Sequence, residues 1–199
     1  LIPDVSDYEF VYKLNVPDNS NFQNDVPYVT DNSNSGSIGD FSRIAYYMEL
    51  EHPTFLSQWV WVSMDAFTTD ASKIGVPTFS SGAIFQESVP NVDVYSNVQP
   101  LCAEGLEGNL EFWPTNYAPQ NADNISGASS NVYDFGDSRQ GSGGAGSMQI
   151  HVASLETTVF AFNRWNRANA DMGIGNNPNG HPDWTRTKNI SPYLSLKHI

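Results

Sequence analysis

The stretch SRIAYYMELE, residues 42–51, decides the fold class of this 199-residue chain. Its large apolar residues recur at every second position, and the residues between them form a second, more polar set. One face would carry Ile44, Tyr46, Met48 and Leu50, and the other would carry Arg43, Ala45, Tyr47, Glu49 and Glu51. A period of two is the signature of a half-buried β-strand.

The same alternation continues through YEFVYKLNV at 8–16 and QWVWVSMDAF at 58–67. Shorter strands are expected at 91–98, 109–113, 147–152, 157–163 and 193–199. Clusters of Gly, Pro, Asn and Ser separate them, and one short helical turn is expected near 66–72. About eight strands at this spacing predict an all-β fold, a two-sheet antiparallel sandwich of jelly-roll-like type with long loops and little helix. We expect residues 1–199 to form a single domain.

The charge balance limits the possible partners. Nine Lys and Arg face 22 Asp and Glu, a formal net charge of −13. Such a surface repels nucleic acid and anionic lipid, so we expect no nucleic-acid partner. No apolar run is long enough to cross a bilayer, so no membrane insertion is expected. Cys102 is the only cysteine, which excludes an intrachain disulfide, and the chain from Leu1 reads as a mature form or an excised domain.

Several catalytic signatures are absent from the sequence, among them G-x-S-x-G, the P-loop, HExxH and paired CxxC. The triplet Gln149-Ile150-His151 would put Gln149 and His151 on one face of a strand. It resembles a short motif of jelly-roll alginate lyases, in which Gln neutralises a uronate and His assists proton abstraction. A lyase or glycosidase that uses His151 and Gln149 is therefore one hypothesis.

Four segments that combine aromatic with polar residues favour a sugar-binding site, at 111–117, 133–137, 163–167 and 183–186. Sugars bind by stacking their C–H faces on Trp or Tyr beside hydrogen-bonding Asp, Asn and Arg. A single Trp in such a segment is explained as well by covering the end of the sandwich, but the set of four weakens that explanation. The candidate ligand-binding residues are Trp113, Asn116, Tyr117, Trp165, Asp183 and Trp184.

Asp134 and Asp137 flank Phe135-Gly136, a turn-like spacing that can aim two carboxylates at one point. Ca²⁺ prefers carboxylate, amide and backbone oxygens, so these two residues are the candidate metal ligands. The acidic loop at 31–40 is an alternative source of such ligands. A structural Ca²⁺ bound by these residues is therefore a hypothesis.

The stretch DMGIGNNPNGHPDWT, residues 171–185, contains almost no residue that a core could use. Its Gly, Asn and Pro content predicts a rigid loop that presents Asp183 and Trp184. Such a loop fits a surface that faces a glycan, and it fits a tightly turned, buried corner equally well.

Taken in order, several segments resemble a domain that is appended to predicted sialate O-acetylesterase-like proteins and other secreted carbohydrate-active proteins of marine bacteria. These segments are FSRIAYYMEL, QWVWVSMDAF, KIGVP, NVDVYSNV, GNLEFWPTNY, VYDFGD, GSMQIHV, TTVFAFNRW and DMGIGNNPNGHPDWT. The resemblance covers about residues 8–199 and implies a secreted, extracellular protein that accompanies hydrolases. The catalytic serine motif of those hydrolases has no match in this chain.

The leading hypothesis is a noncatalytic, lectin-like carbohydrate-binding domain whose partner is a glycan or polysaccharide. The lyase or glycosidase is the first alternative. The second alternative is a structural subunit of an extracellular matrix or assembly, which would form an oligomer or a larger array.

Overall fold

The computed structural model describes residues 5–16, 25–51, 54, 56–77, 85–98, 101–116, 144–152, 157–166, 169–175 and 188–195. These residues form β-strands and two 3-10 helices of three residues each. The elements are η1 (Val5–Asp7), β1 (Tyr8–Phe10), β2 (Tyr12–Val16), β3 (Tyr28–Asp31), β4 (Arg43–Leu50), β5 (Gln58–Asp65), η2 (Ala71–Lys73), β6 (Phe85–Ser96), β7 (Ala103–Asn116), β8 (Gly144–Val152), β9 (Thr157–Asn166), β10 (Asn169–Ile174) and β11 (Lys188–Ser195). Among the described residues, no helix has the length and apolar character needed to span a membrane.

One antiparallel sheet connects all the strands. Its order is β10-β9-β8-β7-β6-β5-β4-β11-β2-β3, and β1 pairs with β11 beside β2. From β4 to β10, each strand pairs with the next one along the chain, which is a meander. The last strand, β11, returns to the first part of the chain and fills the place between β4 and β2.

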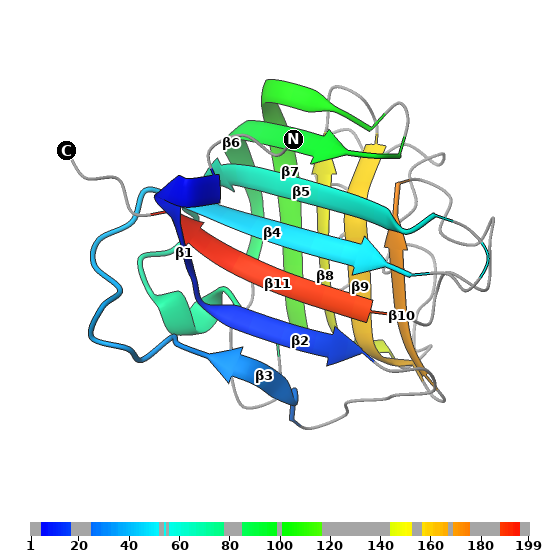
Figure 1. Cartoon of the computed structure of the whole chain (residues 1–199), viewed down its shortest axis with the longest axis horizontal. Helices are drawn as coiled ribbons and strands as arrows, with labels where there is room; N and C mark the ends of the chain where they lie inside the picture. The colour runs from blue at the N-terminus through cyan, green and yellow to red at the C-terminus, as the bar shows by residue number, and fades with distance from the viewer. Residues whose placement is uncertain are drawn as a thin grey trace.

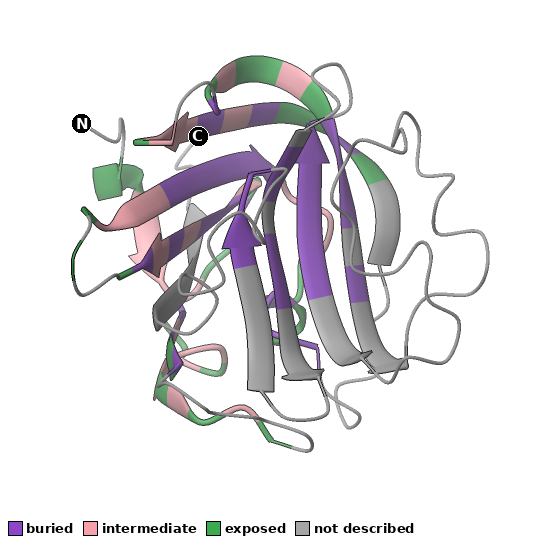
Figure 2. Ribbon diagram, turned by 90° about the vertical axis from the view of Figure 1, so that its right-hand side faces the viewer, coloured by how far each residue is buried: buried purple, intermediate pink, exposed green. Residues whose placement is uncertain are grey.

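The sheet folds over on itself into two layers. In Figure 1, β2, β11, β4 and β5 lie in front, and β7 to β10 cross behind them at a steep angle. Apolar faces of both layers meet between them, and the Tyr46 and Phe112 rings touch edge to face with centroids 5.8 Å apart. Figure 2 shows the buried strand segments of both layers in the middle of the molecule.

The long strand β6 forms a corner between the layers. Its pairing with β7 runs from Phe85 to Val94, its pairing with β5 is confined to residues 93–96, and the register with β7 shifts between Val89 and Val92 and again between Val92 and Val94. Pro90 lies at this shift, and Asn91 has a positive φ of 53°. Bulges and bends of this kind let a strand pass from one layer to the other.

The alternation in the two central strands explains the core. Ile44, Tyr46 and Met48 of β4 are fully buried. Val60, Val62 and Met64 of β5 are also fully buried and complete that face. Burial of such side chains contributes about 1.5–3 kcal/mol each, so these two strands anchor the fold.

The all-β class, the antiparallel pairing and the scarcity of helix are as predicted from the sequence. The two-Greek-key order of a jelly roll is not confirmed, because the described strands run as a meander from β4 to β10. The helical turn expected near 66–72 is η2, and Asp70 caps it by accepting hydrogen bonds from the Ser72 amide and hydroxyl at 3.0 and 2.6 Å.

The strand boundaries differ from the sequence prediction at the C-terminal end. The stretch 171–185 was predicted to be a loop, but residues 171–174 belong to β10, which begins at Asn169, and Ile174 reaches the core with 5% exposure. Gly175, at φ 79°, follows the strand. The final strand was expected at 193–199 and is observed at Lys188–Ser195. The short edge strand β3 was not predicted.

Candidate functional site

The structure reaches only part of the predicted sugar site. Tyr117, Asp183 and Trp184 lie outside the described residues, as do the two candidate metal ligands, Asp134 and Asp137. Trp113 and Asn116 lie on β7, and Trp165 lies on β9. For these three residues the structure describes the backbone.

The strand register brings those three backbone positions to one end of the second layer. Ala145 of β8 pairs with Asn116 on one side and with Trp165 on the other, and Ser147 pairs with Trp113. The register shift between Trp113 and Asn116 matters, because three residues of β7 oppose two of β8 there. A bulge of this kind puts the backbone positions of Trp113 and Asn116 opposite alternate residues of β8, Ser147 and Ala145, despite their odd spacing. The sequence could not reveal this bulge.

Gln149 and His151 are also brought to one face of β8, as the alternation predicted. Met148, Ile150 and Val152 belong to the hydrophobic core, and the two polar residues occupy the positions between them. Gln149 is 0% and His151 is 4% exposed.

Buried polar groups require polar partners. His151 Nδ1 lies 3.2 Å from Thr158 Oγ1, and Thr158 is itself fully buried. The arrangement is that of a buried polar contact between β8 and β9.

A different set of aromatic residues gathers on the outer face of the first layer. This aromatic row consists of Tyr8, Tyr47, Trp59, Trp61 and Tyr95. The row crosses three adjacent strands, because Tyr47 of β4 pairs with Trp61 of β5, which pairs with Tyr95 of β6. These are the positions that alternate with the buried core residues of the same strands.

The rings of the row contact one another. Tyr47 and Trp59 are stacked, with centroids 6.4 Å apart and planes inclined by 29°. Tyr8 meets Trp61 edge to face at 5.1 Å and 88°. Trp61 is buried, whereas Tyr8, Tyr47, Trp59 and Tyr95 are partly exposed. Trp61 therefore supports the row from within, and the other four rings reach its surface.

Carboxylates lie along the row beside the aromatic rings. The Tyr47 hydroxyl donates to Glu49 Oε2 at 3.2 Å, and the Tyr95 hydroxyl donates to Glu104 Oε1 at 3.2 Å. Each pair holds an oxygen acceptor at the hydroxyl edge of an aromatic ring. Flat rings flanked by acceptors can stack on an apolar ligand face and bind hydroxyls at its edge.

Asn97 fixes the end of the row. Its side-chain oxygen accepts a hydrogen bond from the Trp59 amide at 2.7 Å, and its Nδ2 donates to the Ser57 carbonyl at 2.7 Å. The Asn97 amide also donates to the Trp59 carbonyl at 3.3 Å. The backbone that carries Trp59 is thus held on both sides, which reduces the ordering cost of binding.

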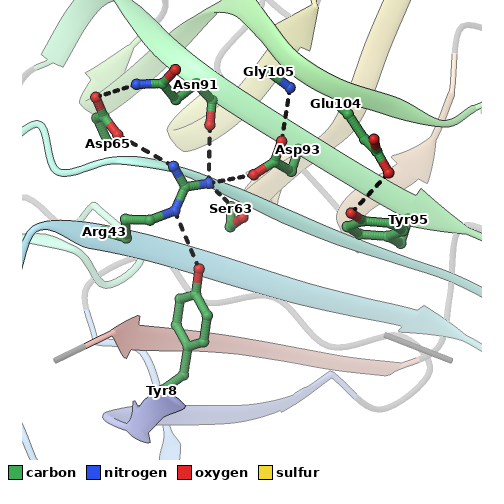
Figure 3. A network of polar contacts seen from close by, with 9 residues as sticks. All are labelled: Tyr8, Arg43, Ser63, Asp65, Asn91, Asp93, Tyr95, Glu104 and Gly105. Atoms are coloured by element: carbon green, nitrogen blue, oxygen red, sulfur yellow. Dashed lines mark hydrogen bonds and ion pairs between the residues drawn. The ribbon is translucent and has the colours of Figure 1, made fainter. Parts of the chain in front are cut away.

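Arg43 organises the other end of this face (Figure 3). Nη1 donates to Asp65 Oδ1 at 3.2 Å, and Nη2 lies 2.7 Å from Asp93 Oδ2, 2.8 Å from Ser63 Oγ and 3.0 Å from the Asn91 carbonyl. The guanidinium therefore joins β4, β5 and the corner of β6.

The outer oxygens of both carboxylates are held as well. Asn91 Nδ2 donates to Asp65 Oδ2, and the Gly105 amide donates to Asp93 Oδ1, each at 2.8 Å. Asn91 has a positive φ and makes two contacts to the cluster. Its carbonyl accepts a hydrogen bond from Arg43, and its side-chain amide donates one to Asp65. Backbone strain of this kind is retained where surrounding contacts determine the conformation.

A cavity of about 650 Å³ opens at this cluster. Its polar lining includes Arg43, Asp65, Asn91 and Asp93, and Phe41 and Ala66 contribute apolar surface. Tyr8 connects the cavity to the aromatic row, because its hydroxyl accepts from Arg43 Nε at 3.5 Å and its ring contacts Trp61. A volume of this order suits a small-molecule-sized group.

The alternation of the sequence also marks this face, which lies on strands and outside the polar-aromatic segments. Arg43, Tyr47 and Glu49 were assigned to the non-core face of one strand, and Trp59 and Trp61 to that of the next. Two Trp on the solvent side of an amphipathic strand are unusual enough to mark a surface with a role.

The described residues contain no group of three or more His, Cys, Asp or Glu side chains that could hold a metal ion. Searches against protein-family models, curated proteins and solved structures found no match for the chain.

Proposed function

We propose that the chain is a noncatalytic carbohydrate-binding domain and that the aromatic row is its binding platform. The observation that carries this proposal is the partly exposed stack of Tyr47 on Trp59 beside the Glu49 carboxylate. Sugar rings have one apolar face and a rim of hydroxyls, so they match an aromatic surface edged by acceptors.

Rigidity and charge support the same proposal. The row lies on paired strands, and Asn97 makes two hydrogen bonds to the Trp59 backbone and one to the Ser57 carbonyl, so little conformational freedom would be lost on binding. The net charge of −13 disfavours polyanionic partners and leaves neutral polymers favoured. A secreted location is expected from the resemblance to domains of carbohydrate-active proteins.

The face that includes Trp113, Asn116 and Trp165 remains a second candidate surface for the same ligand class. The lyase alternative ranks below binding because His151 is almost fully buried, and a proton-abstracting base must reach its polymer. An assembly subunit would use large contacts between copies, and its test is the oligomeric state in solution.

A glycan array followed by calorimetry tests the proposal. We expect the protein to bind at least one neutral polysaccharide, and Trp59→Ala to weaken that binding by about 5- to 30-fold, because stacking on Trp contributes about 1–2 kcal/mol. Val29→Ala is the matched control, since Val29 is 60% exposed on the edge strand β3, away from the row. Absence of binding to every glycan, in calcium and in chelator, would overturn the proposal.

A further inference from the structure

The Arg43 cavity has a chemical character that the aromatic row lacks. Of the residues that line it, Arg43 carries the one positive charge, and Asp65 and Asp93 carry two negative charges. Both carboxylates hold the guanidinium, at 3.2 and 2.7 Å, so the cation is already neutralised within the cluster. The cavity as a whole therefore presents a net negative charge.

Both carboxylates keep capacity to accept further hydrogen bonds. A carboxylate has about four acceptor positions. Within the described part of the chain, Asp65 and Asp93 each use two of them, and their side chains are 41% and 30% exposed. Hydroxyl groups of a ligand can donate to what remains, and charge-assisted bonds of this kind are strong.

The arrangement is fixed before any ligand arrives. Arg43 is only 17% exposed, and Asn91 and Gly105 hold the outer oxygen of each carboxylate. A rigid set of acceptors discriminates against ligands whose groups repel it or cannot donate hydrogen bonds to it. A carboxylate or sulfate entering here would meet two negative charges, while Arg43, the one cation among the described lining residues, is already paired.

We infer that the Arg43–Asp65–Asp93 cavity is the selective end of the binding surface, where a neutral, hydroxyl-rich sugar is accepted and a carboxylated or sulfated one is excluded. This inference rests on the proposed function, because a sugar chain bound on the aromatic row would extend past Tyr8, which contacts both Trp61 and Arg43, into the cavity. Glu49 and Glu104 along the row add to the exclusion of anions.

The test compares sugars that differ only at C6. The probes are oligosaccharides of (1→4)-β-glucan and (1→4)-β-mannan, each beside its counterpart in which the C6 hydroxymethyl group is oxidised to a carboxylate. Calorimetry at low salt should give about tenfold or more tighter binding of at least one neutral probe than of its oxidised form, the order expected for one added like charge. The ratio should shrink at high salt, because screening weakens repulsion at exposed charges.

The decisive variant is Asp65→Asn with Asp93→Asn, which keeps the shape of each side chain and one of its two acceptor oxygens, removes both negative charges and frees the Arg43 charge. We expect it to bring the ratio to about one or to reverse it in favour of the oxidised sugar. Each single variant should reduce the preference for the neutral probe by a smaller amount. The single variants replace the double variant in the test if the double variant does not fold. Thermal melting establishes folding for each protein.

The outcomes separate the two proposals. An unchanged ratio in folded Asp→Asn variants, with neutral binding still lost in Trp59→Ala, would overturn the selective role of the cavity and leave the platform standing. Binding of the oxidised probe by the wild type as tightly as the neutral one would also overturn that role. Failure of the wild type to bind any probe or any arrayed glycan would overturn the platform, and the inference with it.

Discussion

Arg43 Nη2 and Asp93 Oδ2 lie 2.7 Å apart, although the two residues are separated by 50 positions in the chain. Between their strands lies β5, which contributes Asp65 and Ser63 to the same guanidinium. One side chain therefore ties three strands together at the corner where the sheet folds over. The proposed sugar-selective cavity and the stability of this corner depend on the same residue.

Arg43→Met should lower the free energy of unfolding by about 2 kcal/mol, because it leaves two carboxylates facing each other without their cation. Urea denaturation measures this change. Lys73→Met is the matched control: its Nζ lies 3.5 Å from Asp70 Oδ2, and both side chains are about half exposed. An exposed pair of this kind contributes about 0–1 kcal/mol, so similar losses in both variants would contradict the structural role of Arg43.

Tyr46→Phe tests the core beneath the aromatic row. The Tyr46 hydroxyl donates to the Ile74 carbonyl at 2.9 Å, and the side chain is fully buried. Removal of the hydroxyl leaves a buried carbonyl with one partner fewer and should cost about 1–2 kcal/mol at neutral pH. Chemical denaturation at neutral pH measures this loss.

The same variant should change the alkaline stability profile. Burial raises the pKa of Tyr46 well above its ordinary value of 10.0, with smaller contributions from Tyr28 and Tyr12. Above pH 10 the unfolded chain releases this proton while the folded protein retains it, so wild-type stability falls as pH rises. Burial also raises the pKa of Tyr12, so part of the slope remains in Tyr46→Phe. Equal alkaline slopes in the two proteins would be inconsistent with this assignment.

Gly108→Ala should be strongly destabilising. A Cβ at this position would lie 2.6 Å from the His151 carbonyl oxygen and 2.8 Å from Val92 Cγ2, so the backbones of β7 and β8 would have to separate. Overpacking of this kind costs about 1–3 kcal/mol. Gly36→Ala is the control, because a Cβ there has no neighbour within 4 Å. Thermal melting distinguishes the two, and equal midpoints would contradict the tight approach at Gly108.

The sequence predicted the strands whose alternation is strict and missed those set by long-range pairing. The period of two at Ile44, Tyr46 and Met48 was sufficient, because it reports burial on one face directly. The strand β10 was hidden within a stretch rich in Gly and Asn. It forms because β9 supplies a partner for residues 169–174, and pairing of this kind overrides local turn preference.

The sequence prediction and the proposed site use the same types of residue at different positions. Polar-aromatic composition predicts a sugar-binding site that includes Trp113 and Trp165, whereas the aromatic row proposed here includes Trp59 on a central strand. The Arg43 cluster joins residues from three strands, and the corner at Asn91 that completes it depends on a bulge that no local pattern encodes. Such a cluster becomes visible only once the register is known.

His151 is expected to serve the fold and not catalysis. A double-mutant cycle of His151→Ala and Thr158→Val should give a coupling energy of about 0.5–1.5 kcal/mol, since their side chains lie 3.2 Å apart in a buried position. Neither variant should change neutral-glycan affinity. Appearance of an unsaturated, ultraviolet-absorbing product from a polyuronate with the wild type, and its loss in a stable His151→Ala protein, would instead establish the lyase.

The last prediction concerns calcium at Asp134 and Asp137, which lie outside the described residues. At Asp65 and Asp93, the structure relieves the repulsion of two carboxylates with an arginine. The chain has 22 acidic residues and five Arg, so a cation is the more available partner for a second acidic pair. Calcium at about a hundred times its dissociation constant should raise the melting midpoint by about 5–10 °C relative to chelator, because it binds the folded state alone. Asp134→Asn with Asp137→Asn should abolish that rise, and Asp65→Asn should preserve it. Identical midpoints in calcium and chelator would exclude the metal, and pairing with Arg139 or Arg164 would then be the better explanation of the acidic turn.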